Sequence, residues 1–154
     1  MTEAINDPAK SAAITAEDHQ FVFHSWSAQG AIKPLPISGS AGSRFWDYEG
    51  NTYLDFSSQL VFTNIGHQHP KVVKAIQEQA AVLTTIAPQH ASEVRNQAAR
   101  SIVELAGDNF SKVFFTAAGA DAIENAIRMA RLHTRKHKIF STYRSYHGNT
   151  TSAI

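Results

Sequence analysis

The sequence predicts an α/β fold, and three observations carry this prediction. A short, almost wholly apolar run at residues 112–116, a small-residue turn into an amphipathic helix, and a second short run at residues 138–143 follow one another. Apolar strands of this kind are typical of the buried centre of a parallel sheet. Two of them joined by a helix form a right-handed βαβ unit. An aromatic hairpin pattern upstream predicts further strands.

Length and composition limit the class of protein. The chain has 154 residues, 43% of them apolar, and a net charge of +1. This near-neutral balance provides no electrostatic surface for nucleic acid or an anionic membrane. No apolar run approaches the ~18 residues of a membrane span, and the first residues lack the apolar core of a signal peptide. Cysteine is absent, which excludes disulfides and fits a reducing compartment. We therefore expect a cytoplasmic protein that binds neither nucleic acid nor membrane.

The N-terminal part, residues 1–43, is expected to be an arm followed by an aromatic loop. Residues 1–18 are polar and Ala-rich, which predicts a frayed arm or a short helix. Residues 19–30 are rich in aromatic side chains without a clean period, so we expect a loop that packs over another part of the protein. Pro34 and Pro36 then force extended backbone.

A hairpin and two helices are predicted next. Residues 44–48 and 52–56 are aromatic and β-branched and flank a Gly-Asn turn, so residues 44–70 are expected to form a β-hairpin and a loop. Apolar residues at three- and four-residue spacing predict a helix after Pro70, and a second helix from Ser92, a capping residue, to Ala106. Residues 71–107 are thus expected to form a helical connection, and residues 108–154 the start of a larger domain.

The turn at residues 116–121 is the strongest local signal for a ligand. Its small side chains let backbone N–H groups approach a ligand, and the helix N-terminus adds unpaired donors and about half a positive charge. A phosphate group suits that arrangement. The single glycine, Gly119, makes neither a dinucleotide fingerprint nor a Walker loop. A turn that only permits close packing explains the same residues, and dipole complementation explains Asp121 and Glu124.

A second candidate is the loop after the second predicted strand. Loops beyond the carboxyl ends of parallel strands are where α/β sheets bind ligands. Tyr146 offers a flat face to an aromatic ring, and Gly148 lets the backbone turn away. An ordinary packed tyrosine is the alternative reading.

Histidine spacing does not predict a metal site. His67 and His69 are separated by one residue in a loop, which is poor ligand spacing, so structural hydrogen bonding is the better interpretation. His133 and His137 stand among Arg and Lys residues, which predicts a solvated basic surface.

The last residues predict an interrupted domain. Residues 146–154 read as a loop entering a further helix, and the chain stops about one turn into it. A two-strand βαβ unit also exposes both sheet edges, which a finished domain pairs or covers. We therefore expect the chain to be the N-terminal portion of a larger domain.

The order of four segments resembles the N-terminal third of the class III, fold-type I pyridoxal-phosphate (PLP) aminotransferases. The matching segments are residues 45–56, 64–70, 114–124 and 146–148. The resemblance implies the PLP-dependent transferase fold type I, with the N-terminal arm and small-domain part followed by the first βαβ of the large cofactor domain. It also implies amine or amino acid and keto acid substrates, and a homodimer with residues 84–90 near its interface.

The resemblance also implies roles for individual residues. The cofactor-binding positions are Ala118, Gly119, Ala120, Glu124, Tyr146, His147 and Gly148. The turn around Gly119 would bind the PLP phosphate through backbone N–H groups, Tyr146 would stack on the pyridine ring, and Glu124 matches an acid held near the cofactor. Trp26 and Val61 match positions that wall the substrate pocket.

Two departures from the family pattern bear on these expectations. The family commonly has hydroxyl side chains where this sequence has Ala118 and Ala120, so only backbone donors remain for the phosphate. The lysine that holds PLP as a Schiff base, the aspartate that pairs with the ring nitrogen and the arginine for the substrate carboxylate would all lie beyond Ile154. The chain alone is therefore expected to be inactive.

A racemase, mutase or decarboxylase of the same class, or a non-catalytic truncated paralogue, remains an alternative to an aminotransferase.

Overall fold

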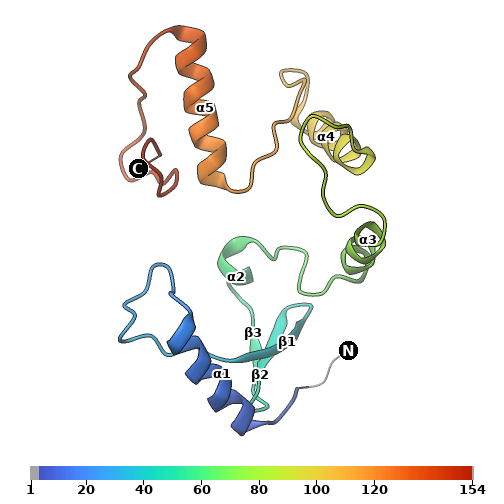
Figure 1. Cartoon of the computed structure of the whole chain (residues 1–154), viewed down its shortest axis with the longest axis vertical. Coiled ribbons are helices and arrows are strands. Elements are labelled where there is room, and N and C mark those ends of the chain that lie inside the picture. The colour runs from blue at the N-terminus through green and yellow to red at the C-terminus, as the bar shows by residue number, and fades with distance from the viewer. Residues whose placement is uncertain (1–3, 154) are drawn as a thin grey trace. The chain divides into compact units, whose positions relative to one another are not determined.

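The computed structural model describes residues 4–153 and shows two compact units (Figure 1). Unit 1 is Met1–Thr85 and unit 2 is Ile86–Ile154. The boundary falls inside the segment 71–107 that was expected to be one helical connection. Unit 1 contains α1 (Pro8–Phe21), β1 (Ile37–Ala41), β2 (Arg44–Asp47), β3 (Thr52–Leu54), α2 (Ser58–Val61) and α3 (Pro70–Ala80). Unit 2 contains α4 (Glu93–Ala106) and α5 (Gly119–Thr134).

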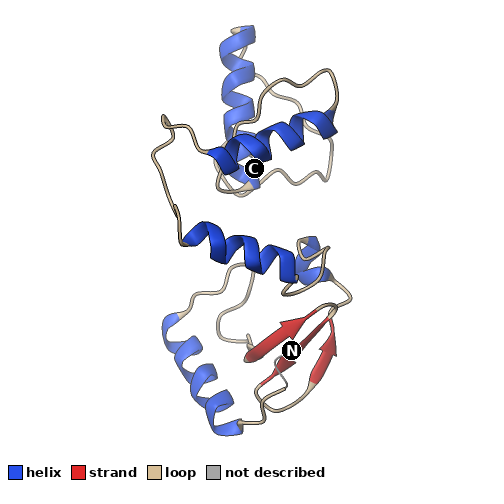
Figure 2. Cartoon of the chain, turned by 90° about the vertical axis from the view of Figure 1, so that its right-hand side faces the viewer, coloured by secondary structure: helices blue, strands red, loops and turns tan. Residues whose placement is uncertain are grey.

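The sheet of unit 1 is antiparallel with strand order β1-β2-β3 (Figure 2). The predicted hairpin is confirmed, because β2 and β3 pair with Phe45 opposite Tyr53. Their rings stack at 5.1 Å between centroids on one face, whereas Trp46 is buried on the other. The strand β1 was not predicted from the sequence; it pairs with β2 and places Gly39 opposite Trp46. A Cβ at Gly39 would lie 2.6 Å from Trp46 Nε1, so the indole occupies the space that glycine leaves.

Asp47 ties the hairpin turn together from inside the sheet. Its side chain is buried, and its Oδ1 accepts the backbone N–H groups of Glu49 and Asn51, each at 2.9 Å. Its Oδ2 accepts the Asn51 side-chain amide at 2.9 Å and the Tyr53 hydroxyl at 2.8 Å. Burial alone would raise the pKa of Asp47, but the Asn51 and Tyr53 side chains and the two backbone N–H groups outweigh it and lower the pKa from 3.8 to about 2.

Helix α1 docks on this turn, and Figure 1 shows it beside the strands. Asp7 caps the helix by accepting the Lys10 N–H at 3.0 Å, with Pro8 at the first helical position. The Asp7 N–H donates to the Tyr48 carbonyl at 2.6 Å, and the buried Ser11 hydroxyl donates to Glu49 at 3.2 Å. Of the two predicted forms of the arm, the short helix is the one observed.

The predicted helices α3 and α4 form, with Pro70 opening the first and Gly107 (φ 85°) ending the second. Ser92 stands at the N-cap of α4, although its side chain makes no capping bond within the described structure. Their apolar stripes are present but remain partly exposed, as at Ile76 (63%) and Leu105 (89%). Among residues 4–153 the buried apolar side chains are Trp46, Ile127 and Ala153.

The two strands predicted in unit 2 are not formed. Residues 112–116 and 138–143 flank α5 as predicted, but neither belongs to a hydrogen-bonded strand within residues 4–153. A β-strand exists only through its ladder to a neighbour, and these segments have no ladder partner in the described chain. Phe114 and Phe140 are accordingly exposed, at 61% and 91%. Of the predicted βαβ unit, the structure contains the helix.

Two further expectations differ from the structure. The aromatic loop at residues 19–30 was expected to pack over another part, yet Phe23 and Trp26 are 85% and 80% exposed. Residues 150–153 form turns rather than the start of a helix. None of the helices within residues 4–153 combines the length and apolarity needed to cross a bilayer.

Candidate functional site

An open cavity of about 590 Å³ lies at the N-terminus of α5 in unit 2. It brings the turn Ala118–Ala120 together with the loop that carries Tyr146 and Gly148, which are about 28 residues apart in sequence. The lining residues are Ala118, Gly119, Ala120, Ala122, Ile123, Tyr146, His147, Gly148 and Asn149. Six of the seven predicted cofactor positions therefore surround one cavity, whose volume is within the ordinary range of small-molecule sites.

The floor of this cavity offers backbone donors. Ala118 is extended (φ −153°, ψ 166°) at the N-cap, and its methyl side chain cannot accept a hydrogen bond. The first intrahelical bond runs from the Ala122 N–H to the Ala118 carbonyl at 3.1 Å. The N–H groups of the first turn therefore have no acceptor inside the helix, and they point out of its positive end. A Cβ added at Gly119 would meet no atom within 4 Å, so this side of the turn is open.

Gly148 sets how closely the loop approaches the helix. Its φ is 137°, a conformation that side chains rarely adopt. A Cβ added at Gly148 would lie 2.7 Å from Ala120 Cβ and 3.2 Å from Ala153 Cβ. The loop can therefore rest against the first turn of α5 only because Gly148 in the loop and Ala120 in the helix are both small.

Gly148→Ala is expected to push the loop away from α5 and to weaken ligand binding in the cavity by about tenfold. The added methyl group meets Ala120 and also strains the backbone, so the Tyr146 ring moves with the loop. Ligand affinity of the purified complete protein, measured by equilibrium titration, tests this. Gly107→Ala is the matched control, because Gly107 also has a positive φ but a Cβ there meets nothing within 4 Å. Equal affinities of the two variants would contradict the close-approach role of Gly148.

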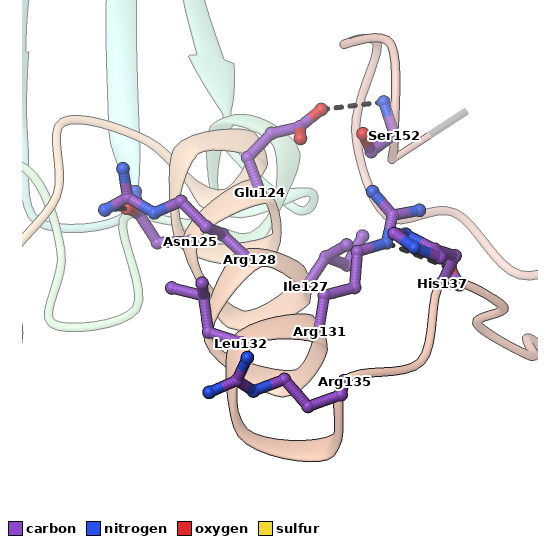
Figure 3. Close-up of a pocket in the computed structure, with 9 residues that line it drawn as sticks. All are labelled: Glu124, Asn125, Ile127, Arg128, Arg131, Leu132, Arg135, His137 and Ser152. Atoms are coloured by element: carbon purple, nitrogen blue, oxygen red, sulfur yellow. Dashed lines mark hydrogen bonds between the residues drawn. The ribbon is translucent and has the colours of Figure 1, made fainter.

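Glu124 holds the end of the same loop from outside the cavity. Its Oε1 accepts the Ser152 N–H at 2.8 Å, and Figure 3 shows the carboxylate turned toward Ser152. The Thr150 hydroxyl and the Ser152 backbone N–H outweigh burial and lower the pKa of Glu124 below its usual value. Glu124 lines the neighbouring pocket rather than the cavity at the helix N-terminus. Glu124 therefore holds the end of the loop through this hydrogen bond, and it lies outside the cavity that the other six predicted cofactor residues line.

The neighbouring pocket, about 770 Å³, is lined by the arginines of the C-terminal half of α5 (Figure 3). Their guanidinium groups do not converge. Arg131 donates from Nε to the His137 carbonyl at 3.0 Å, whereas Arg128 leans to the other side and donates to Asn125 at 2.8 Å. Across residues 4–153 no three His, Asp or Glu side chains are grouped to hold a metal ion.

The two predicted substrate-pocket residues lie in unit 1. Trp26 is 80% exposed in a loop that the Gln29 side chain holds, donating to the carbonyls of His24 at 2.6 Å and Ser27 at 2.9 Å. Val61 is 76% exposed and ends α2.

Helix α2 is a left-handed turn, which sequence reasoning missed. Ser58, Gln59, Leu60 and Val61 have φ between 48° and 72°. L-residues resist this conformation by roughly 1–2 kcal/mol each, and a β-branched residue such as Val61 is an outlier there. Strained backbone of this kind clusters at functional sites. None of these four positions is a glycine, the residue that would indicate left-handed backbone, so the sequence did not predict this turn.

His67 makes the structural hydrogen bond that was predicted for it. Its Nε2 lies 2.7 Å from Asp55 Oδ2, and because a carboxylate only accepts, the imidazole donates. Asp55, which precedes the left-handed turn, was not singled out from the sequence. Burial would raise the pKa of Asp55, but the bonds from His67 and from Gln59 outweigh it and lower the pKa below 3.8.

The chain is similar to one protein family over most of its length. The family described as Aminotransferase class-III matches residues 26–154. Acetylornithine aminotransferase of Methanosarcina acetivorans is 32% identical over 158 residues, covering 100% of this chain and 38% of the relative. Acetylornithine aminotransferase of Halalkalibacterium halodurans is 38% identical over 120 residues, covering 78% of this chain and 31% of the relative.

Solved structures agree with this similarity. The taurine:2-oxoglutarate aminotransferase of Bifidobacterium kashiwanohense, solved in complex with PLP and glutamate, matches with a TM-score of 0.88 and 43% identity, covering 99% of this chain and 33% of that chain. An S-selective transaminase from Arthrobacter sp. with alanine bound matches with a TM-score of 0.86 and 29% identity, covering 92% of this chain and 31% of that chain. The chain thus spans about a third of the length of the relatives it matches.

Proposed function

Because this chain belongs to the class III aminotransferase family, we propose that the complete protein is an aminotransferase that moves an amino group from an amine or amino acid to an α-keto acid. The class is PLP-dependent, and one of the similar structures holds PLP. The cavity at the N-terminus of α5 is the observation that carries the proposal. It joins the backbone N–H donors at the start of α5, a kind of site that binds phosphate groups, to a loop with an aromatic ring.

The residues of this cavity fit PLP. The open side at Gly119 and the N–H groups of the first turn of α5 would hold the phosphate, while Tyr146 would offer its ring to the pyridine. Gly148 keeps the loop close to the helix, and Glu124 fastens the loop end through Ser152. When bound, PLP supplies the electron sink for removing and adding the amino group. The chain's part in this chemistry is to bind and orient the cofactor.

The remaining site residues concern the substrate and the assembly. We propose that Trp26 and Val61 line the substrate pocket, as the family resemblance implies. The relatives act on substrates as different as acetylornithine and taurine, by their names, so we propose only an amine or amino acid donor for this protein. We further propose a homodimer in the cytoplasm, which the family pattern and the absence of cysteine support.

The complete protein, loaded with PLP, is expected to change its cofactor absorbance when an amino donor is added alone, and to recover the original spectrum when 2-oxoglutarate follows. This two-step behaviour is the signature of ping-pong amino transfer. Taurine, acetylornithine and alanine are suitable donors to begin with, and stopped-flow absorbance is the measurement. Protein without PLP is the control. A donor that is consumed without passing its amino group to any keto acid would contradict the proposal.

A further inference from the structure

A line of hydrogen bonds in unit 1 leads to the left-handed turn Ser58–Val61. It begins at the turn between β1 and β2, where the His67 N–H donates to the Gly42 carbonyl at 2.7 Å and the Gly42 N–H donates to the His67 carbonyl at 3.0 Å. This pair fixes the His67 backbone to the sheet. The segment that follows α2 is therefore anchored at a defined point of the fold.

The second part of the line is the buried pair of His67 and Asp55. The side chains are 14% and 3% exposed, and the imidazole Nε2 lies 2.7 Å from Asp55 Oδ2. A carboxylate this buried needs donors for both oxygens. Its other oxygen, Oδ1, accepts the backbone N–H of Gln59 at 3.2 Å and lies 3.4 Å from the Ser57 hydroxyl. Asp55 thus connects the anchored His67 to the beginning of the left-handed turn.

The residue types of this turn do not favour left-handed backbone. None of its four residues is glycine, and right-handed backbone is the lower-energy choice for each of them. Strained conformations persist only where the surroundings over-determine them. The bond from the Gln59 N–H to a buried, anchored carboxylate is such a constraint, and it acts on a residue inside the turn.

We propose that Asp55, held by His67, is a positioning residue that keeps Ser58–Val61 left-handed and so sets the direction in which Val61 leaves the backbone toward the substrate. Reversing the handedness of the turn would redirect the Leu60 and Val61 side chains, because side-chain direction follows the backbone. This inference rests on the proposed function, in which Val61 walls the substrate pocket. Asp55 acts through the turn and does not itself touch the substrate.

The test compares variants of the complete, PLP-loaded protein. In Asp55→Ala we expect residues 58–61 to relax to negative φ in the crystal structure and the KM for the amino donor to rise about tenfold, with kcat changed less than about threefold. Asp55→Asn keeps an oxygen for the Gln59 N–H, so we expect it to retain the turn and most of the affinity. Glu78→Gln is the matched control, because it neutralises a carboxylate of the exposed pair with Lys74 on α3 and should leave both readouts unchanged.

The outcomes distinguish a failure of the positioning role of Asp55 from a failure of the proposed aminotransferase function. A left-handed turn that persists in Asp55→Ala overturns the positioning role, and so does a relaxed turn with an unchanged KM in an active enzyme. If the wild-type protein transfers no amino group, the proposed function fails, while the φ angles of the variants still decide whether Asp55 holds the turn. Should Asp55→Ala not fold, His67→Leu removes the anchor of Asp55 and is decided by the same two measurements.

Discussion

Gly119→Asp in the complete protein is expected to weaken PLP binding by about 100-fold. The substitution places a carboxylate where the backbone turn is open and where the phosphate is proposed to bind. Like charges at such close range in partly desolvated surroundings repel by roughly 3 kcal/mol, which corresponds to about two factors of ten in affinity. Equilibrium titration of the protein with PLP, followed by absorbance, measures the change.

The matched control for this variant is Gly119→Asn, which has nearly the same size but no charge. Because a Cβ at Gly119 meets no atom within 4 Å, either side chain should be accommodated without disturbing α5. We therefore expect the Asn variant to lose much less affinity than the Asp variant. Equal losses would indicate that space rather than charge is limiting, and unchanged affinity in both would refute the placement of the phosphate.

Asp47→Ala is expected to destabilise unit 1 severely, lowering its Tm by roughly ten degrees or more. Asp47 is the buried partner of these part-buried hydrogen bonds, and its removal leaves donors of Glu49, Asn51 and Tyr53 without their shared acceptor. A polar group that loses its partner while shielded from water costs more than the bond contributed. Thermal unfolding, together with hydrogen exchange at the amides of β2 and β3, measures the effect within unit 1.

Asp108→Ala is the control for the Asp47 variant, because it removes an exposed carboxylate. We expect its unfolding and its exchange in β2 and β3 to match the wild-type protein. Wild-type protection of β2 and β3 in Asp47→Ala would show that the turn does not depend on this carboxylate.

The same carboxylate predicts acid sensitivity of unit 1. The pKa of Asp47 is about 2 in the folded protein against an ordinary value of 3.8. A depressed folded pKa means that the unfolded chain takes up the proton first, so the contribution to stability is complete above pH ~4 and is lost as the pH falls toward ~2. Asp47→Asn should remove this part of the pH dependence. A pH profile of unfolding with the same slope in both proteins would show that other groups are responsible.

Local patterns predicted the elements whose causes are local. The Gly-Asn turn between aromatic runs predicted the hairpin of β2 and β3, and Pro70 and Gly107 marked ends of α3 and α4 as observed. Periodicity also predicted α5. By contrast β1 was missed, because its sequence, Ile-Ser-Gly-Ser-Ala, has weak strand propensity and forms a strand only by pairing with β2.

The segments 112–116 and 138–143, in contrast to β1, were predicted to be strands but did not form them. Their apolar composition is that of buried strands, but composition does not supply a ladder partner, and the described residues hold none for them. The side chains that would be buried, such as Phe140, are instead exposed.

For the candidate site, residue types singled out positions that the structure brings together, while their binding roles stay predictions. The small residues around Gly119 and the loop with Tyr146 and Gly148 were singled out separately, and the structure brings them to one cavity. Glu124 was grouped with them, but its carboxylate turns to Ser152 outside that cavity. The role of Glu124 depends on which donors surround it, and its donor Ser152 lies 28 residues further along the chain.

The sequence by itself thus determined the class III aminotransferase family, the hairpin of β2 and β3, the helices α3, α4 and α5, and the small residues that leave backbone donors open at the start of α5. These are properties of residue type and spacing along the chain. Only the tertiary structure decided that Asp47 is enclosed by four donors and that Asp55 links His67 to a left-handed turn. The physical reason is that burial and hydrogen bonding are properties of neighbours in space, and only folding brings those neighbours to each carboxylate.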